Sequence, residues 1–376
     1  MKIAVVGGGP AGLYFAYLFK RRRPDAEIRV FEQNPAGATF GFGVVFSDQA
    51  LDFLRTDDPE TYDLVTPAME TWRDLTIVHR GERLRLDGFG FSAIGRLRLL
   101  QLLQSRVASV GVEPAFETPL RSLDEVGEVD LIIGADGVNS LVRTSRARAF
   151  GAAVGAFANK FVWYGTSQVF ETLTQTFVAN DDGVFNAHHY RYAPDMSTFL
   201  VETDAATWAR AGFAGMDSAT TQRYCEDVFA DALGGHSLVS NNSIWRTFPR
   251  VRNDRWSAGN AVLLGDALHT AHFSIGSGTR LALEDVIALV AALEDHGDDI
   301  ATALESYEAR RRPIVDKLVA AADASALWYE RFGEHMTLPP WDLAWSYVMR
   351  SGRINRDRLA ATAPQFVAGY EASRSY

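Results

Sequence analysis

The sequence predicts an α/β fold in which a Rossmann-like dinucleotide-binding domain is interrupted by an antiparallel sheet and followed by a helical C-terminal region. The apolar run over residues 2–6 ends in a glycine turn and leads into a helical pattern, which is typical of a buried parallel strand. Two further apolar runs, 128–134 and 261–264, also end in glycine turns. Between them, residues 156–202 hold β-branched and aromatic runs separated by turn residues, which is typical of antiparallel strands.

The first glycine turn carries the motif G-x-G-x-x-G over residues 7–12, followed by a helix predicted over 13–20. In dinucleotide-binding folds the first glycine allows a tight turn, the second lets the backbone approach a pyrophosphate, and the third lets helix and strand pack closely. A second strand, 28–31, ends in the acid Glu32, which can accept hydrogen bonds from an adenosine ribose. A plain glycine-rich turn is the alternative, but strand, helix and acid together favour dinucleotide binding. The candidate cofactor-binding residues here are Gly7, Gly9, Ala11, Gly12, Glu32 and Gln33.

Residues 34–48 are predicted to form a loop, because they contain three glycines and a proline. The aromatic residues of this loop are too apolar for a free surface loop, so we favour contact with a flat ligand, with Gly43 and Val44 as candidate cofactor contacts. Residues 48–72 are predicted to be helical and irregular, and residues 74–91 to contribute strands to a second sheet. A helix is predicted from Ile94 to about Val110, where Arg96 can reach a phosphate or remain solvated.

The second and third glycine turns each carry an acid. Asp136 follows the strand 128–134 and lies where the carboxyl end of a strand meets a ligand crevice, although it can equally cap a helix. Asp266 occupies the same place after the strand 261–264. The segment Gly276-Ser277-Gly278 precedes a long helix predicted from Leu281, whose free N–H groups and positive end suit a developing negative charge on a flat cofactor.

The remaining elements divide the chain into predicted domains. Strands are expected over 161–164, 176–178, 184–190 and 197–202, and helices over 204–211, 218–233 and 300–332. The predicted nucleotide-binding domain comprises residues 1–73, 94–155 and 245–330, the substrate-binding sheet domain 74–93 and 156–244, and the helical tail 331–376.

Composition excludes several classes of function. The chain has 376 residues, of which 47% are hydrophobic, and a net charge of -10, which argues against general binding to nucleic acid or to membrane surfaces. Its one cysteine, Cys225, excludes an internal disulfide and a cysteine-built metal site, and we expect it to be a buried helix residue. No metal site is predicted. No signal peptide fits before the strand at residue 2, and the most apolar helix candidate, 281–293, is too short to span a bilayer, so a soluble cytoplasmic protein is predicted.

The three glycine turns, taken in this order with Glu32, Asp136 and Asp266, resemble the single-component (group A) FAD-dependent aromatic monooxygenases, typified by p-hydroxybenzoate hydroxylase. The resemblance covers the whole chain. The closer match is to enzymes of the salicylyl-CoA 5-hydroxylase and 2-aminobenzoyl-CoA monooxygenase kind, with the pigment hydroxylases of violacein synthesis as cousins. It rests on residues 42–47, 163–166, 197–202 and 272–278, while residues 351–354 favour the aryl-CoA enzymes.

The resemblance implies a cofactor and roles for the candidate residues. FAD would be bound, with NADH or NADPH and O2 as cosubstrates. Arg96 would contact the phosphates and Asp136 the pyrophosphate region and the passing nicotinamide. Asp266 would hydrogen-bond the ribitol hydroxyls, and N–H groups around Ser277 and Gly278 would face the pyrimidine edge of the flavin. Many members carry prolines at the positions of His272 and Phe273.

The resemblance also implies the chemistry. A flavin hydroperoxide would hydroxylate the aromatic ring of an aryl-CoA thioester, most simply salicylyl-CoA to gentisyl-CoA, because an ortho hydroxyl activates the para position of the ring. A base that draws on this hydroxyl would raise the reactivity, and His272 and His188 are the candidates, with a purely structural histidine as the alternative for each. His269, which follows the Gly265-Asp266 turn, is expected to hold the backbone of that turn in position. Trp163, Tyr190 and Phe273 are the predicted pocket wall.

The sequence is also compatible with other partners and functions. Arg350, Arg353, Arg356 and Arg358 can supply a basic patch for the charges of CoA, or form a solvated helix face in an Arg-rich chain. The alternatives to an aryl-CoA hydroxylase are a flavin hydroxylase of an indolic or carrier-bound aromatic substrate in natural-product biosynthesis, and a flavin-binding protein without hydroxylase activity. A monomer or a homodimer is expected.

Overall fold

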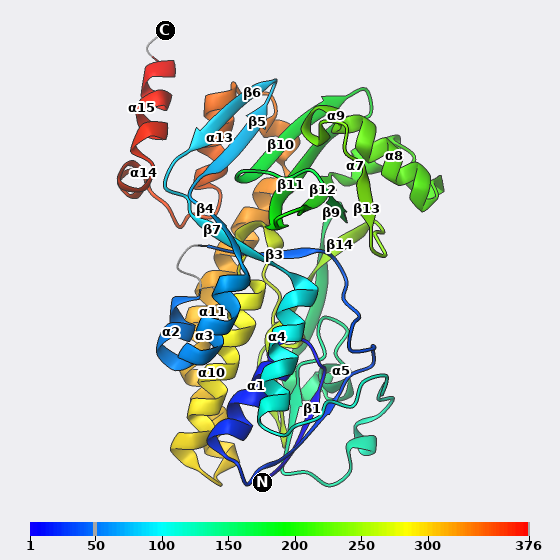
Figure 1. Ribbon diagram of the computed structural model, residues 1–376, viewed down its shortest axis with the longest axis vertical. Coiled ribbons are helices and arrows are strands. Elements are labelled where there is room, and N and C mark those ends of the chain that lie inside the picture. Colours follow the sequence, from blue (N-terminus) through cyan, green and yellow to red (C-terminus); the bar gives the residue numbers. More distant parts are fainter. Residues whose placement is uncertain (48–50, 375–376) are drawn as a thin grey trace.

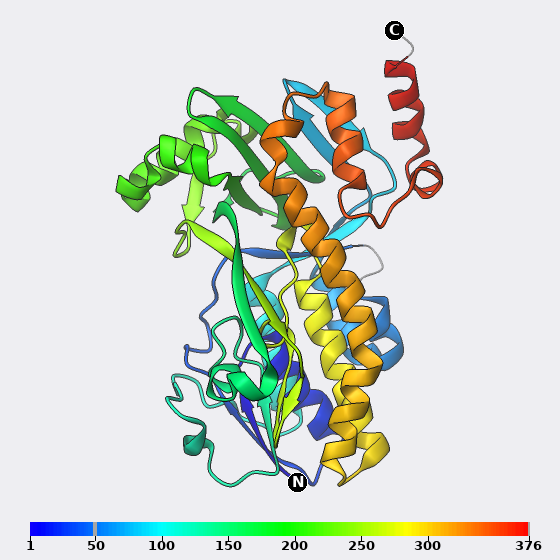
Figure 2. The same cartoon turned by 180° about the vertical axis from the view of Figure 1, so that it is seen from behind.

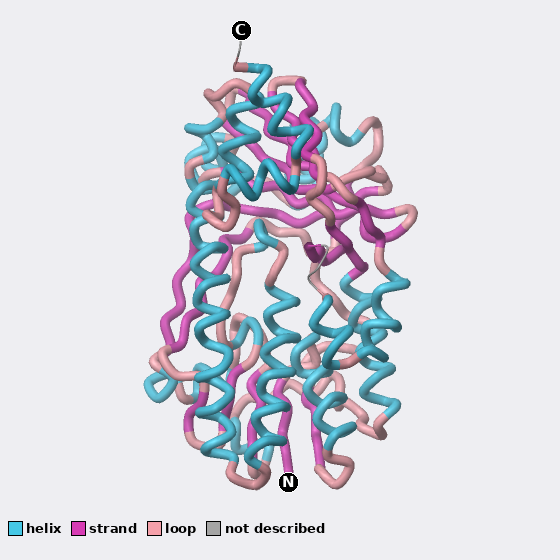
Figure 3. The backbone as a smooth tube through the Cα atoms, turned by 90° about the vertical axis from the view of Figure 1, so that its left-hand side faces the viewer, coloured by secondary structure: helices cyan, strands magenta, loops and turns pink. Residues whose placement is uncertain are grey.

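The computed structural model describes residues 1–47 and 51–374. The molecule is elongated, and its two termini lie at opposite ends (Figures 1 and 3). One half holds a parallel sheet with helices packed on it, and the other half holds a larger sheet and the C-terminal helices. Figure 2 shows the helix α11 (Ile300–Glu330) running along both halves, beside the long strands β9 (Ala152–Thr166) and β14 (Arg246–Asn253).

The first sheet has five strands in the order β15-β16-β8-β1-β2. Its strands are β1 (Lys2–Val6), β2 (Glu27–Phe31), β8 (Leu131–Gly134), β15 (Ser257–Ala258) and β16 (Ala261–Leu263). The strands β2, β1, β8 and β16 are mutually parallel, so the three glycine turns that follow β1, β8 and β16 meet at one edge of the sheet. The predicted Rossmann-like fold is confirmed.

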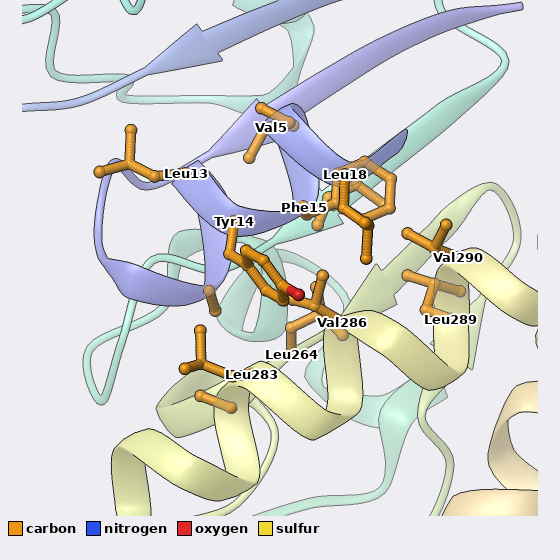
Figure 4. Packing of buried hydrophobic residues seen from close by; sticks show 14 of the residues in the cluster. Val5, Leu13, Tyr14, Phe15, Leu18, Leu264, Leu283, Val286, Leu289 and Val290 are labelled. Carbon is orange, nitrogen blue, oxygen red and sulfur yellow. The ribbon is translucent and has the colours of Figure 1, made fainter. Parts of the chain in front are cut away.

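Four long helices and this sheet build the main core. The helices are α1 (Pro10–Arg22), α4 (Arg96–Ser109), α10 (Gly278–His296) and α11. The helix α1 packs on the sheet, α4 and α10 pack on α1, and α11 packs on α10. Figure 4 shows how α1 packs on α10, with Tyr14 and Leu18 facing Val286 and Val290. All four of these side chains are fully buried, and burying an aliphatic or aromatic side chain of this size stabilises a fold by about 1.5–3 kcal/mol. This packing fixes the start of α1, and with it the glycine turn, relative to the start of α10.

The second sheet has eight strands, in the order β13-β9-β12-β11-β10-β5-β6, with β14 paired to β9. Its further strands are β5 (Leu75–His79), β6 (Glu82–Leu86), β10 (Leu173–Asn180), β11 (Gly183–Ala193), β12 (Met196–Thr203) and β13 (Leu238–Ser240). The prediction of antiparallel pairing needs one correction, because β10 and β5 are parallel. The two strands are far apart in the sequence, so no short turn fixes their relative direction. The alternation of residues within each strand does not show whether it pairs parallel or antiparallel.

The predicted loop over residues 34–48 is partly wrong, because it contains the strand β3 (Gly43–Ser47). This strand pairs antiparallel with β7 (Phe91–Gly95), which also pairs with β4 (Glu70–Trp72) in a three-stranded sheet. The run Val44-Val45-Phe46 consists of β-branched and aromatic residues, which favour a strand. Pairing with β7 stabilises this strand despite the flexible glycines before it. Residue 48 and the start of the predicted helical stretch lie outside the described residues.

Several other predicted bounds shift in the structure. The stretch 48–72 holds α2 (Asp52–Asp57), α3 (Pro59–Val65) and a 3-10 turn (Thr66–Ala68), but ends in β4 rather than in helix. The helix predicted over 218–233 is divided into α8 (Ser218–Val228) and α9 (Ala230–Leu233), preceded by α7 (Ala205–Arg210). Cys225 is buried in α8, as predicted. Short helices α5 (Leu141–Ser145) and α6 (Ala147–Phe150) follow β8.

The C-terminal region is helical, as predicted, with α12 (Phe332–His335), α13 (Pro340–Met349), α14 (Arg356–Thr362) and α15 (Pro364–Ser373). The division of the chain into domains stays a prediction; its boundaries at 93/94 and 155/156 fall inside β7 and β9. Over residues 1–47 and 51–374, no helix combines the length and the apolar character needed to cross a membrane, and no group of three or more His, Cys, Asp or Glu side chains could hold a metal ion.

A buried ion network links α10 to α11. Arg311 contacts Asp285 at 2.8 Å and Glu284 at 2.6 Å, and Asp285 also contacts the ring of His269 at 2.8 Å. Replacing Arg311 by methionine leaves these carboxylates without their cation, so we expect the free energy of unfolding in urea to fall by about 3–5 kcal/mol. The adjacent Arg310 forms an exposed pair with Asp295, and its replacement by methionine is the matched control, with an expected loss of about 1 kcal/mol or less. Equal losses in the two variants would contradict this account of the network.

Candidate active site

A cavity of about 1140 Å³ lies at the edge of the first sheet and continues beneath the second sheet. It collects residues that are far apart in the sequence. The predicted site residues that line it are Gly7, Gly9, Ala11, Glu32, Gln33, Gly43, Val44, Arg96, Asp136, Trp163, His188, Tyr190, Asp266, Phe273, Gly276, Ser277 and Gly278. Gly12 and His272 do not line it.

The three glycines of the first turn face different surroundings. Gly7 has φ 108°, and a Cβ at this position would collide with the backbone of Ala135 after β8. A Cβ on Gly12 would collide with the carbonyl oxygen of Gly7, so this residue lets α1 pack on the turn. A Cβ on Gly9 would meet no protein atom within 4 Å, because this position opens into the cavity. Gly9 is therefore where a ligand can approach the backbone most closely.

Glu32 fixes the wall beside this turn. Its Oε2 accepts a hydrogen bond from the N–H of Gly8 at 2.7 Å, and its Oε1 accepts one from the N–H of Asn34 at 2.8 Å. The carboxylate thereby links the end of β2 to the glycine turn and is held at the cavity surface. It has further lone pairs with which to accept hydrogen bonds from hydroxyl groups of a ligand.

Asp136 acts as a helix cap and also leaves one oxygen without a partner. Its Oδ2 accepts hydrogen bonds from the N–H groups of Leu141 at 2.6 Å and Val142 at 3.2 Å, at the start of α5. Its Oδ1 is buried without a hydrogen-bond partner among the described residues, and burial raises the pKa of this carboxyl. A buried polar atom without a partner in a cavity wall indicates a missing donor from a ligand or a water molecule.

The opposite wall carries a guanidinium and a carboxylate. Arg96 is the first residue of α4, and its side chain makes no hydrogen bond or ion pair with the described residues. Burial lowers the pKa of Arg96, and the charge of Asp266 opposes this shift. Asp266 belongs to a 3-10 turn (Gly265–Ala267) after β16 and exposes its side chain to the cavity. An unpaired cation in such a wall favours an anionic ligand.

The helix α10 begins at Gly278, three residues earlier than predicted, and its N-terminus faces the cavity. A 3-10 turn (Phe273–Ile275) precedes it and ends at Gly276, where φ is 59°. The first N–H groups of α10 have no partner within the helix, and the helix dipole makes this end positive. This end of the cavity suits a flat ligand on which negative charge develops.

Aromatic residues form the wall beneath the second sheet. The hydroxyl of Tyr190 donates a hydrogen bond to the carbonyl oxygen of Gly43 at 3.0 Å, which ties β11 to β3. The indole Nε1 of Trp163 is buried and has no partner among the described residues. Phe273 packs on Phe161 with ring centroids 5.1 Å apart. These side chains leave an apolar space with one free indole donor.

Sequence reasoning missed Gln175, Leu200 and Phe248, which also line the cavity. Gln175 on β10 and Leu200 on β12 are both directly opposite His188 on β11. Residues directly opposite each other on neighbouring strands share one face of the sheet. The missing signal is the register of these strands, which a single sequence does not contain.

His188 is the centre of a buried hydrogen-bond network. The amide Nε2 of Gln175 donates to its Nδ1 at 3.0 Å, and its Nε2 donates to Oε2 of Glu202 at 3.3 Å. The hydroxyl of Tyr329 donates to Oε1 of Gln175 at 3.2 Å, and the amide of Asn159 donates to Oε1 of Glu202 at 2.9 Å. Burial lowers the pKa of His188 to about 3, with the charge of Arg350 acting in the same direction, so the imidazole is neutral. Burial raises the pKa of Glu202.

The structure separates the second candidate histidine from the cavity. The Nδ1 of His272 accepts a hydrogen bond from the N–H of Ser274 at 3.3 Å, and its ring packs on Phe248 with centroids 4.8 Å apart. Burial lowers the pKa of His272 to about 4. His269 contacts Asp285 and does not line the cavity either. Of the three histidines considered from the sequence, only His188 reaches the cavity.

Comparison with known proteins agrees with this geometry. Two family models match the chain, an FAD binding domain over residues 124–322 and an NAD(P)-binding Rossmann-like domain over residues 5–42. Salicyloyl-CoA 5-hydroxylase of a Streptomyces species is 43% identical, over 98% of this chain and 72% of that protein. The 3-hydroxy-4-methyl-anthranilyl-(aryl-carrier protein) 5-monooxygenase of Streptosporangium sibiricum is 37% identical, over 96% of this chain and 97% of that protein. The structure of 2-methyl-3-hydroxypyridine-5-carboxylic acid oxygenase in its tetrameric form shares the fold, with a TM-score of 0.72 at 20% identity over 96% of this chain and 95% of that chain.

Proposed function

We propose, from the premise that this chain belongs to the single-component FAD-dependent aromatic monooxygenases, that it hydroxylates the ring of an aryl-CoA thioester. The enzyme uses FAD, NAD(P)H and O2. Salicylyl-CoA is the proposed substrate and gentisyl-CoA the product, because the relative with 43% identity acts on salicyloyl-CoA by its name.

The residues of the cavity fit FAD. The open position at Gly9 suits the pyrophosphate, Glu32 the adenosine ribose, Arg96 a phosphate and Asp266 the ribitol hydroxyls. The unpartnered Oδ1 of Asp136 would accept a hydrogen bond from the bound cofactor or from a water molecule beside it. When bound, FAD would carry two electrons from NAD(P)H to O2, so that one oxygen atom of O2 enters the ring and the other leaves as water.

The aromatic wall orients the substrate and excludes water. Trp163, Tyr190 and Phe273, together with Leu200 and Phe248, offer an apolar space for a flat ring in the same cavity as the start of α10. Excluding water would keep the activated oxygen from being lost to solvent before it reaches the ring. The free Nε1–H of Trp163 can hydrogen-bond an oxygen substituent of the ring or the thioester carbonyl.

His188 and Glu202 together provide a place for the proton of the ring hydroxyl. In the absence of substrate, Gln175 donates to Nδ1 of His188, and we infer that the substrate hydroxyl replaces this donor. The O–H proton then moves to Nδ1 while the proton on Nε2 moves to Oε2 of Glu202, whose pKa is raised by burial. The imidazole stays neutral throughout, so its low pKa does not oppose the transfer. The ring gains electron density at the para position. His272 acts, in this proposal, as a positioning residue through its hydrogen bond with Ser274.

The observation that carries the proposal is the convergence of the phosphate-binding turns and the aromatic wall in one cavity. The test uses the FAD-loaded protein with NADH or NADPH, O2 and either salicylyl-CoA or free salicylate. We expect the thioester product to gain one oxygen atom and kcat/KM for the thioester to exceed that for the free acid by about tenfold or more. NAD(P)H oxidation without oxygen gain in any product would refute the hydroxylase proposal. A higher kcat/KM for free salicylate than for salicylyl-CoA would refute the proposal that the substrate is a thioester.

One alternative has a specific observation in its favour. The relative from Streptosporangium sibiricum acts, by its name, on an aromatic group held by an aryl-carrier protein. An aromatic thioester of a carrier protein and one of CoA present the same acyl group, so the same assay with an aryl-carrier thioester separates them. The preference for NADH or NADPH, the monomeric or dimeric state and the cytoplasmic location remain predictions.

A further inference from the structure

The lining of the cavity extends past the FAD and substrate residues to the C-terminal helices. It includes residues from Tyr347, near the end of α13, to Arg358, near the start of α14. It also includes residues 88–90, which connect β6 to β7, and Phe91 at the start of β7. The end of α14 closes on this connection, because a Cβ on Gly88 would collide with the carbonyl oxygen of Thr362. Asp87 holds the start of α15 by accepting a hydrogen bond from the N–H of Phe366 at 2.9 Å. The arrangement gives the cavity a second wall made by the tail of the chain.

This part of the wall carries Arg350, whose guanidinium is bound to protein oxygens, and three further arginines, Arg280, Arg353 and Arg358. The side chains of Arg353 and Arg358 make no hydrogen bond and no ion pair with any residue in the described ranges, and both are exposed. Among the described residues, Arg280 pairs with one carboxylate, that of Glu284, at 2.7 Å. Although Arg353 is exposed as a whole, its guanidinium is partly buried in the cavity wall. This partial burial, and then the like charges of Arg280 and Arg358, lower the pKa of Arg353, so the three guanidinium groups lie near one another.

The tail arginines predicted as one basic patch have separate surroundings. Arg350 is bound inside the protein, where it donates to the carbonyl oxygen of Ser274 at 2.8 Å and to Oγ of Ser325 at 2.9 Å. Arg356 pairs with Glu371 on the outer surface and does not line the cavity. Arg350, Arg353 and Arg358 of the predicted patch line the cavity, but the guanidinium of Arg350 is already bound to protein oxygens. Arg353 and Arg358 therefore supply the free donors of the patch, and Arg280 of α10 joins them.

A concentration of uncompensated positive charge is unexpected in a chain with 47 acidic and 37 basic residues. Like charges that repel each other in a cavity wall raise the free energy of the empty site, and a bound polyanion removes this cost. Guanidinium groups bind phosphate oxygens through paired, charge-assisted hydrogen bonds. The segment that carries Arg353 also lines the cavity with the apolar surfaces of Tyr347, Val348 and Ile354.

We propose that Arg280, Arg353 and Arg358 bind the phosphate groups of the nucleotide end of a CoA thioester whose acyl group lies at the aromatic wall. The inference rests on the proposed function for the identity of the acyl group. The apolar surfaces of the same part of the wall accommodate the pantetheine arm. The same phosphate chemistry occurs in NAD(P)H, and the experiment separates these two sources.

The test compares Arg353→Ala and Arg358→Ala with Arg356→Ala, a matched control that removes an equal charge from the same segment outside the cavity. Binding of free CoA to the FAD-loaded protein is measured by calorimetry, without turnover. We expect the Kd of CoA and the KM of salicylyl-CoA to rise by about tenfold in each cavity variant, with kcat unchanged. The KM of the pantetheine thioester of salicylate, which lacks the nucleotide, and the KM of NAD(P)H are expected to stay unchanged, as are all values in Arg356→Ala.

Three results would overturn the assignment. The first is an equal loss of CoA affinity in Arg356→Ala and in the cavity variants, and the second is an equal rise in KM for the CoA and pantetheine thioesters. The third is a rise in the KM of NAD(P)H alone, which would show that the three arginines bind the cosubstrate. Failure of the proposed function looks different, because CoA would still bind through Arg353 and Arg358 while no thioester gained oxygen. Thermal unfolding of each variant checks that the exposed substitutions leave the fold intact.

Discussion

Replacing Gly9 by alanine is expected to weaken FAD binding by at least about tenfold while the flavin-free protein stays folded. The backbone of Gly9 has φ -75°, which alanine adopts without strain, and a Cβ there would meet no protein atom within 4 Å. The methyl group would instead occupy space at the cavity surface where the pyrophosphate approaches. Gly9 caps α1, so we expect a loss of about 1 kcal/mol or less in the urea unfolding of the flavin-free protein. The Kd of FAD is measured by the quenching of flavin fluorescence.

Gly12→Ala is the control for Gly9→Ala, because it disturbs the packing of the same turn. A Cβ on Gly12 would collide with the carbonyl oxygen of Gly7, so the turn and α1 must move apart. We expect this variant to lose about 1–3 kcal/mol of stability as well as FAD affinity. Wild-type FAD affinity in Gly9→Ala would show that the pyrophosphate is not bound at this turn.

Replacing His188 by asparagine is expected to lower kcat for salicylyl-CoA by about 10²–10⁴-fold with FAD affinity unchanged. Asparagine cannot relay the hydroxyl proton from the substrate to Glu202, so the ring would react without gaining electron density. Glu202→Gln removes the acceptor of the same proton and should give a comparable loss. A fluorinated substrate, whose ring hydroxyl ionises more readily in water, should recover part of the rate in His188→Asn.

His189→Asn is the matched control for His188. The two histidines are neighbours on β11, so their side chains point to opposite faces of the sheet. His189 stacks on Phe199 with centroids 5.1 Å apart and does not line the cavity. We expect His189→Asn to change stability but not kcat. If both substitutions lower kcat equally, or if the fluorinated substrate restores nothing, the relay is wrong and His188 has only a structural role.

The parts of the site that could be predicted from the sequence are those whose structure is determined by neighbouring residues in the chain. The turn at residues 7–12 combines steric requirements that only glycine meets, and its position between an apolar strand and a helix is visible in the residues themselves. The same holds for Asp136 and Asp266, because parallel strands bring their carboxyl ends to one edge. These residues could be assigned before the packing of the second sheet was known.

The parts that could not be predicted depend on contacts between distant segments. Gln175 reaches His188 through the register of β10 and β11, and Glu202 reaches it from β12. His272 has a sequence context close to the site, but its hydrogen bond with Ser274 and its packing on Phe248 direct it away from the cavity. The position of Arg353 beside Arg280 depends on how the tail folds back on the body, for which a short charged helix gives no local signal.

The central claim is that FAD occupies the cavity between the glycine turns and the aromatic wall. Its most direct test is the visible absorption spectrum of the purified wild-type protein after incubation with excess FAD and removal of free flavin. The account predicts a yellow protein that retains an equimolar amount of FAD. A wild-type protein that remains colourless after this treatment would contradict it.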